Sequence, residues 1–380
     1  AMTTSQGDMP DRLDRTRAWM AGHDIDTLFV YCYRSSLTAH WTGYCPRHSV
    51  TNASLIVITP GNAVHITRLP LHSATAERES TAITQICAAR SNWASADTSD
   101  MIDVALGWLG SQVAGPRNAF AAYRPEAGVK EELAQRLPGG LVDVTSLLTE
   151  HLAPKDPGEI ARLRVAARCA QEAFDAGIAA MKAGGVGNDA LRAAEAVLRD
   201  YGSLTWHCFV GATDAQGRSL LQPSKSILTP GTTVFFEVIP DVESFCPEVV
   251  SSVFIVEPPP RAAELDALMA RSLDGLLATI TPATTFADVF TSVVSDLESA
   301  GLSRDDITRL GHGTGIDNIE LPEYISETDN RALGVNRVIS VHPNIGTEQF
   351  GTILRGGTII VTDTGAERLF SLPDGPLVAG

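Results

Sequence analysis

The first part of the chain alternates between short apolar blocks and amphipathic stretches. Residues 27–31, 53–59 and 63–67 are rich in β-branched and aromatic side chains, which is typical of buried strands. The turn residues at 60–62 separate the last two blocks and predict a hairpin. The same reading predicts a strand over 119–123 and helices over 11–20, 101–109 and 131–137. Together these elements predict an α/β domain.

A more helical pattern begins near residue 154. Pro157 stands at the start of a long amphipathic run that ends near Met181, and a missing N–H is harmless at that place. Two further helices are predicted over 188–201 and 262–279. Strand-like runs lie between and after these helices, at 233–239, 249–256, 338–342 and 358–362. We therefore predict an α+β chain with domains 1–153 and 154–380, the second having helices that cover a mainly antiparallel sheet.

Composition narrows the classes of protein. Of 380 residues, 44% are hydrophobic and 19% charged, and no apolar run is long enough to span a bilayer, so a membrane protein is not expected. A formal charge of −16 disfavours nucleic acid as a partner. The first residues lack the basic and apolar segments of a secretory signal, and the six cysteines form no CxxC pair. A cytoplasmic location is therefore expected.

Two histidines and two glutamates form the candidate reactive group. His312 lies between two glycines, and His342 follows thirty residues later in the sequence Val-His-Pro-Asn. Glu237 stands inside an apolar strand, and Glu248 comes eleven residues after it, so two hairpin strands would bring both carboxylates together. An ionised carboxylate in an apolar strand is costly unless a cation, a donor or a proton compensates it. A metal ion, a buried salt bridge or exposure at a sheet edge would each satisfy this requirement.

The order of these motifs resembles the pita-bread family of creatinase, aminopeptidase P, prolidase and methionine aminopeptidase. The resemblance covers most of the chain, from the helix opening at 155–167, through Pro-Gly at 230–231, to the Gly-Ala-Glu turn at 365–367. Trp206 shortly before Phe209 is more similar to creatinase than to the peptidases. The resemblance implies an N-terminal α/β creatinase-type domain followed by a C-terminal pita-bread domain.

Metal-binding members of this family hold two ions with five ligands. The resemblance places these positions, in chain order, on Glu237, Glu248, His312, His342 and Gly356. Only the histidine at 312 is unchanged, and the last, bridging carboxylate is replaced by glycine. A two-metal peptidase centre is therefore not expected. Because two imidazoles and one carboxylate are typical of a single-ion site, Glu248, His312 and His342 are expected to hold one divalent ion of iron, zinc or manganese, with Glu237 as a fourth ligand or next to the ligands. A metal-free site is the alternative, with either histidine as general acid or base and either glutamate orienting it or binding a cationic substrate group.

The resemblance also assigns substrate contacts. Trp206 and Phe209 are expected to bind substrate, and His207 between them is a candidate proton relay, because the loop at 217–223 lacks the histidine that creatinase-like enzymes use there. A loop of the N-terminal domain, at 41–48, is expected to reach the neighbouring active site in a homodimer. Its Arg47 could hold a substrate carboxylate bidentately.

The function expected from these residues is hydrolysis of a C–N bond in a small nitrogen-containing acid or amide. A second interpretation is a metal-dependent lyase or an iron-dependent oxidative enzyme, because two imidazoles and one carboxylate leave coordination positions open. A third is a catalytically silent binding module, since such a module would also show lost ligands.

Overall fold

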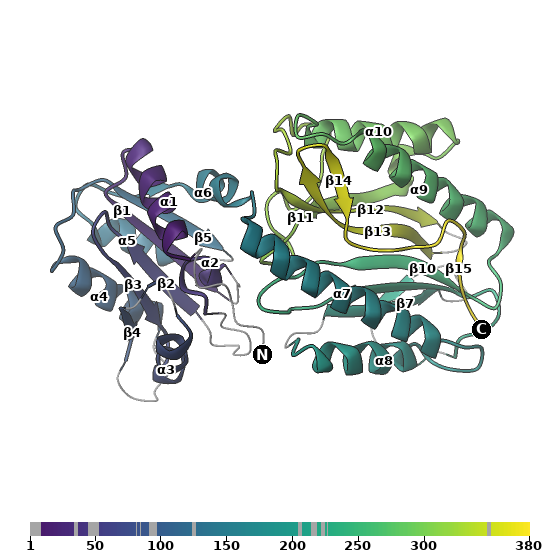
Figure 1. Cartoon of the computed structure of the whole chain (residues 1–380), viewed down its shortest axis with the longest axis horizontal. Helices are drawn as coiled ribbons and strands as arrows, with labels where there is room; N and C mark the ends of the chain where they lie inside the picture. The colour runs from purple at the N-terminus through teal and green to yellow at the C-terminus, as the bar shows by residue number, and fades with distance from the viewer. Residues whose placement is uncertain are drawn as a thin grey trace. The chain divides into compact units, whose positions relative to one another are not determined.

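A computed structural model describes residues 9–33, 37–44, 53–80, 82–83, 85–90, 97–123, 127–203, 207–213, 219–221, 225, 227–347 and 351–380. Internal contacts divide the chain into two compact units, Ala1–Leu152 and Ala153–Gly380 (Figure 1). This division falls one residue before the boundary predicted from the sequence. None of the described helices is both long and apolar enough to cross a bilayer.

The first unit is a six-stranded mixed sheet with helices. Its strands have the order β4-β3-β2-β1-β5-β6. The predicted hairpin is confirmed, because β2 and β3 pair antiparallel, whereas β1 and β5 pair parallel. In chain order the elements are α1 (Met9–Gly22), β1 (Thr27–Tyr33), α2 (Thr38–Thr42), β2 (Ala53–Ile58), β3 (Ala63–Thr67), α3 (Pro70–Glu79), β4 (Ile86–Ala88), α4 (Thr98–Leu109), β5 (Asn118–Tyr123), α5 (Val129–Arg136), β6 (Val142–Asp143) and α6 (Thr145–Leu152).

The second unit is built on a nine-stranded sheet. Its main path is β11-β12-β13-β10-β9-β7-β8, with β14 paired to β13 and β15 to β10. Among the described pairs only β10 with β15 is parallel, so the predicted antiparallel character is confirmed. The elements are α7 (Pro157–Ala180), α8 (Gly187–Asp200), β7 (His207–Thr213), β8 (Ser219–Leu221), β9 (Thr233–Ile239), β10 (Val249–Ile255), α9 (Pro260–Thr279), α10 (Phe286–Ser299), the 3-10 turn η1 (Arg304–Asp306), β11 (Ile307–Gly313), β12 (Val338–Thr347), β13 (Gly351–Thr362), β14 (Gly365–Arg368) and β15 (Leu377–Ala379).

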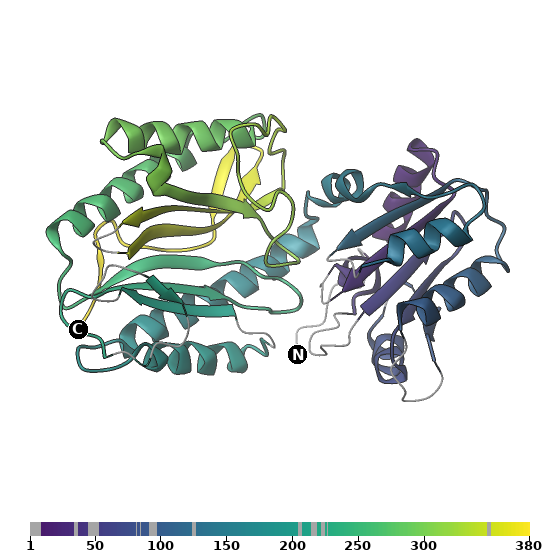
Figure 2. The same cartoon turned by 180° about the vertical axis from the view of Figure 1, so that it is seen from behind.

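Long helices cover one face of this second sheet. Helices α7 and α9 lie in front of the strands in Figure 1, and the strands lie in front of the helices when the molecule is seen from behind in Figure 2. Phe236 on β9 stacks on Phe174 of α7, with ring centroids 5.3 Å apart. Val249 on β10 and Val341 on β12 belong to the same buried core. Every second residue of these strands therefore points away from the helices.

The first long helix starts where the sequence predicts it. Asp156 caps α7 by accepting a hydrogen bond from the backbone N–H of Glu159, whose side chain accepts one from the N–H of Asp156 in return. Pro157 occupies the first turn, where no N–H is needed. Both capping side chains are buried, so the chain enters the second unit in a fixed direction.

Candidate metal centre

Strand alternation brings the candidate residues to one face of the second sheet. Glu248 and His342 each stand next to a core valine, Val249 and Val341, so their side chains point to the face opposite the helices. His312 on β11 pairs with Ser340 of β12, which lies on that same face two residues before His342. Three neighbouring regions of the sheet therefore contribute to one place.

The three side chains meet in a buried cluster. His342 Nε2 lies 3.2 Å from Oε1 of Glu248, and His312 Nε2 lies 3.5 Å from Oε2 of the same carboxylate. The two imidazole centroids are 5.3 Å apart. One ligand atom from each of the three residues lies within 4.8 Å of the others. All three residues are buried, at 5% relative exposure or less.

The hydrogen bond made by Nδ1 of each imidazole determines whether its Nε2 can act as a metal ligand. His312 Nδ1 donates to the backbone oxygen of Gly313 at 2.9 Å, and His342 Nδ1 donates to Oδ1 of Asn344 at 3.2 Å. Because these oxygens only accept, Nδ1 carries the proton in each ring. Each neutral ring then presents the lone pair of Nε2 to Glu248. Histidine ligands of metal ions are commonly oriented in this way.

This donor set fits one divalent cation. Both carboxylate oxygens of Glu248 and Nε2 of His342 are buried without a hydrogen-bond partner among the described residues. Three lone-pair carriers facing one another at this depth need a shared cation or protons, since unpaired buried polar atoms are costly. Two imidazoles and one carboxylate are known ligands for catalytic zinc and for mononuclear iron. The residues present therefore match the single ion expected from the sequence.

The charges in the cluster favour metal-ligating protonation states. Burial alone would raise the pKa of Glu248, but the electrostatic interactions of its carboxylate with His312 and His342 lower this pKa to about 2. Burial lowers the pKa of His342 below its ordinary value, against the opposing charge of Glu248. At neutral pH Glu248 is thus an anion and His342 a neutral base. Both are in the state that a metal ion requires.

Glu237 lies beside the cluster without belonging to it. It pairs with Val250 across β9 and β10, so it is the diagonal neighbour of Glu248 on the same face. Its carboxylate is not part of the group of three residues whose ligand atoms lie within 4.8 Å of one another. Of the two places expected for Glu237, fourth ligand or neighbour of the ligands, this arrangement favours the second. Burial, together with the negative charge of Glu248, raises the pKa of Glu237 well above its ordinary value. A carboxyl that holds its proton here is suited to proton transfer.

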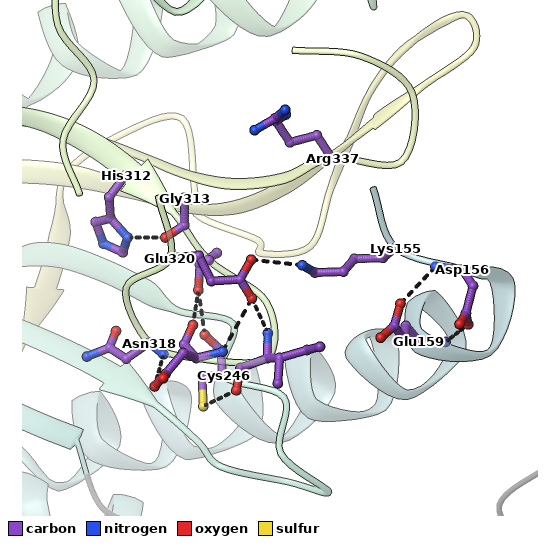
Figure 3. A network of polar contacts seen from close by, with 12 residues as sticks. Lys155, Asp156, Glu159, Cys246, His312, Gly313, Asn318, Glu320 and Arg337 are labelled. Carbon is purple, nitrogen blue, oxygen red and sulfur yellow. Dashed lines mark hydrogen bonds and ion pairs between the residues drawn. The ribbon is translucent and has the colours of Figure 1, made fainter. Parts of the chain in front are cut away.

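The segment after His312 is held by a buried network, drawn in Figure 3. Glu320 forms an ion pair with Nζ of Lys155 at 2.8 Å. It also accepts a hydrogen bond from the backbone N–H of Ile316 at 2.7 Å. Gly313 N donates to Pro322 O at 2.8 Å, and a Cβ at Gly313 would lie 2.6 Å from Leu321 O. Glycine is therefore required where the carbonyl that orients His312 meets this segment.

Gly356 occupies the position that the resemblance assigns to the fifth ligand. It lies on β13 against the β12 backbone, and a Cβ added there would be 2.0 Å from Val341 O and 2.6 Å from His342 Cα. A side chain at this place would therefore collide with the strand that carries His342. The backbones of β12 and β13 are thus in close contact at the position that the resemblance assigns to the bridging carboxylate.

Of the residues predicted to bind substrate or relay a proton, the structure describes the side chain of Phe209 but not those of the other three. Phe209 is exposed on β7 and pairs with Glu237, so it lies on the candidate face beside the centre. His207 lies on the same strand, opposite Ile239, and its side chain is outside the described residues, as are Arg47 and Trp206.

Two neighbours of the centre were missed by sequence reasoning. Asn344 orients His342, and its position two residues after that histidine was the available signal. Arg309 stands three residues before His312, and no motif marks it.

More than half of the chain matches a family of known proteins. A family model described as metallopeptidase family M24 matches residues 161–363, more than half of the chain. An uncharacterized peptidase of Staphylococcus aureus is 23% identical over 60% of this chain and 65% of its own length, so the chain spans just under two thirds of that relative.

Solved structures share the fold over nearly the whole chain. An X-Pro aminopeptidase from Thermotoga maritima has a TM-score of 0.80 and 18% identity, covering 97% of this chain and 99% of that one. The N-terminal domain of the FACT complex subunit SPT16 from Cicer arietinum has a TM-score of 0.75 and 13% identity, with complete coverage of both chains. These similarities show the fold, and the expected pita-bread architecture is confirmed.

Proposed function

The chain belongs to metallopeptidase family M24, and from that premise we propose that it is a hydrolase that uses one divalent metal ion to cleave a C–N bond in a small nitrogen-containing acid or amide. The observation that carries this proposal is the buried meeting of Glu248, His312 and His342, with both Nε2 lone pairs directed at the carboxylate. We further propose that iron, zinc or manganese occupies this place.

Different residues of the chain orient the metal ligands, transfer protons and contact the substrate. When bound, a divalent ion supplies Lewis-acid polarisation of a carbonyl oxygen and lowers the pKa of water. Asn344 and the Gly313 carbonyl hold the two imidazoles in the ligating tautomer, so the site is ready without rearrangement. Glu237, which holds a proton at rest, gives that proton to the departing nitrogen and regains one from the water that adds to the carbonyl carbon. Phe209, exposed beside Glu237, offers an apolar surface for the substrate.

A homodimer belongs to the same proposal. Arg47 and its loop are assigned to the neighbouring active site by the resemblance alone.

The role of Glu237 is tested with Glu237→Gln, which keeps the shape of the side chain and removes its titratable carboxyl group. We expect kcat to fall by about 10²- to 10⁴-fold toward any amide that the metal-loaded protein hydrolyses, with metal content unchanged. The assay measures amine release from N-acyl amino acids, Xaa-Pro dipeptides and guanidino acids, with zinc, manganese and ferrous iron supplied separately. The exposed Glu257→Gln is the matched control. Unchanged turnover in Glu237→Gln would remove this residue from the mechanism.

An iron-dependent lyase or oxidative enzyme is the second candidate, and one observation favours it. Two histidines and one carboxylate form the ligand set of many mononuclear iron enzymes that activate oxygen. Oxygen uptake by the ferrous protein, without amine release from any amide, would select this function. The catalytically silent module is the third candidate, and absence of bound metal, with no activity under any of these conditions, would select it.

A further inference from the structure

Arg309 lies on β11, the strand that carries His312, and faces β12, the strand that carries His342. It stands on β11 three residues before His312, and its cross-strand partner is Asn344, the residue that orients His342. The pairing of β11 with β12 is irregular on both sides of Arg309. Such irregularities turn a side chain away from the direction that simple alternation would give it.

The guanidinium of Arg309 has unused donors. One Nη2 bond goes to the backbone oxygen of Glu323 at 3.2 Å, whereas the Nε–H is buried and has no acceptor among the described residues. No ion pair of Arg309 with an acidic side chain is formed in the described part of the chain. A guanidinium has five N–H donors, and a buried donor without a partner is costly.

Many arginines of this acidic protein pair with a carboxylate, whereas Arg309 does not do so within the described part of the chain. The chain has 45 acidic residues against 29 lysines and arginines. The buried Arg355 pairs with Asp266 at 3.1 Å, and Arg164 pairs with Glu367 at 2.6 Å. Because no carboxylate among the described residues forms an ion pair with Arg309, its guanidinium can pair with the carboxylate of a ligand.

The positive charge of Arg309 acts on the metal centre. It opposes the rise in the pKa of Glu237 and contributes to the lowered pKa of His342, so both groups lie within its electrostatic reach. The guanidinium is half-buried, and it is therefore neither sealed in the core nor fully solvated. A negative group placed next to Arg309 would be attracted by its guanidinium.

We propose that Arg309 binds a carboxylate of the substrate, through its Nε–H and a neighbouring N–H, while the scissile C–N bond lies at the Glu248, His312 and His342 centre. This rests on the proposed function and narrows it, because the substrate is then a small amide or related C–N compound that carries a free carboxylate. The planar fork of a guanidinium matches a carboxylate with two parallel hydrogen bonds. A phosphate is disfavoured, since its second negative charge would face Glu248 as well.

The test is equilibrium binding by the zinc-loaded protein, followed by titration calorimetry. The probes are N-acetylglycine and N-acetylproline, each compared with its own carboxamide. We expect both carboxylates to bind more tightly than their carboxamides, and Arg309→Met to weaken carboxylate binding by about tenfold to a hundredfold while leaving carboxamide binding unchanged. Arg309→Lys keeps the charge without the fork, so we expect an intermediate loss. The exposed Arg261→Met, on α9, is the control for removing a positive charge.

Each outcome bears on the inference separately from the hydrolase assignment. Carboxylate binding that persists in Arg309→Met, or no Arg309-dependent preference for either carboxylate, would overturn the inference even if amides are hydrolysed. Arg309-dependent carboxylate binding without any hydrolysis would support it and would instead count against the hydrolase. Metal content measured for each variant confirms that the centre is intact.

Discussion

Replacing His342 with alanine reduces turnover by about a thousandfold or more and releases the metal ion, while the protein stays folded. The expected loss follows from geometry. His342 supplies one of three ligand atoms that meet within 4.8 Å, and its partner Glu248 Oε1 lies only 3.2 Å away. The fold survives because the strand β12 is held on both sides, by β11 and β13. Activity and metal content of purified His342→Ala, together with its circular dichroism, measure this result.

His65→Ala is the matched control for losing a buried histidine. His65 lies fully buried in the first unit, where its Nε2 bonds Oγ of Ser54 at 2.9 Å. Its removal leaves a cavity and is expected to lower the free energy of unfolding without loss of metal. If His342→Ala retains the metal and turns over at the wild-type rate, the centre has been placed on the wrong residues.

Replacing Gly356 with alanine lowers the free energy of unfolding by about 3 kcal/mol and weakens metal binding. The new Cβ would lie 2.0 Å from the Val341 oxygen and 2.9 Å from His342 Cβ, and the colliding atoms are mainly backbone, which cannot move aside cheaply. His342 must therefore shift with its strand. Chemical denaturation measures the first effect, and metal titration measures the second.

Gly275→Ala provides the comparison for this substitution. Gly275 is exposed inside α9, and a Cβ there meets nothing within 4 Å. Alanine at that position is expected to stabilise the protein by about 0.5–1 kcal/mol, because alanine favours a helix over glycine. A Gly356→Ala variant as stable as the wild type would show that β12 and β13 are less tightly apposed than described. Gly356→Glu is expected to fail in the same way, and therefore not to create a second metal site.

The pita-bread fold predicted from the sequence is confirmed, and three of the predicted site residues, Glu248, His312 and His342, come together in the structure. His312 lies between two glycines and His342 is followed by proline, which made both candidates, and Glu237 is a candidate because it interrupts an apolar strand, with Glu248 eleven residues later. The relation of Glu237 to the centre was harder to foresee. It depends on which of two alternating faces each strand presents, and on a diagonal rather than direct pairing across β9 and β10.

Some elements could not be predicted because their local patterns are weak. Strand β11 holds His312, but its second and third residues are polar and it ends in glycine, so its pattern is typical of a loop rather than of a strand. Helix α10 did carry a signal, since Thr285 and Asp288 form a capping box at its start. Arg309 has no sequence signature, because its importance comes from an irregular strand pairing and from a buried Nε–H that has no acceptor among the described residues.

The number of metal ions per chain is the most direct measurement of the central claim. Purified protein, loaded with zinc, freed of excess metal and analysed by inductively coupled plasma mass spectrometry, is expected to retain one ion per chain, and Glu248→Gln is expected to retain none. Two ions per chain would contradict the closed position at Gly356. Retention of the ion by Glu248→Gln, or no ion in the wild type, would contradict the ligand set of Glu248, His312 and His342.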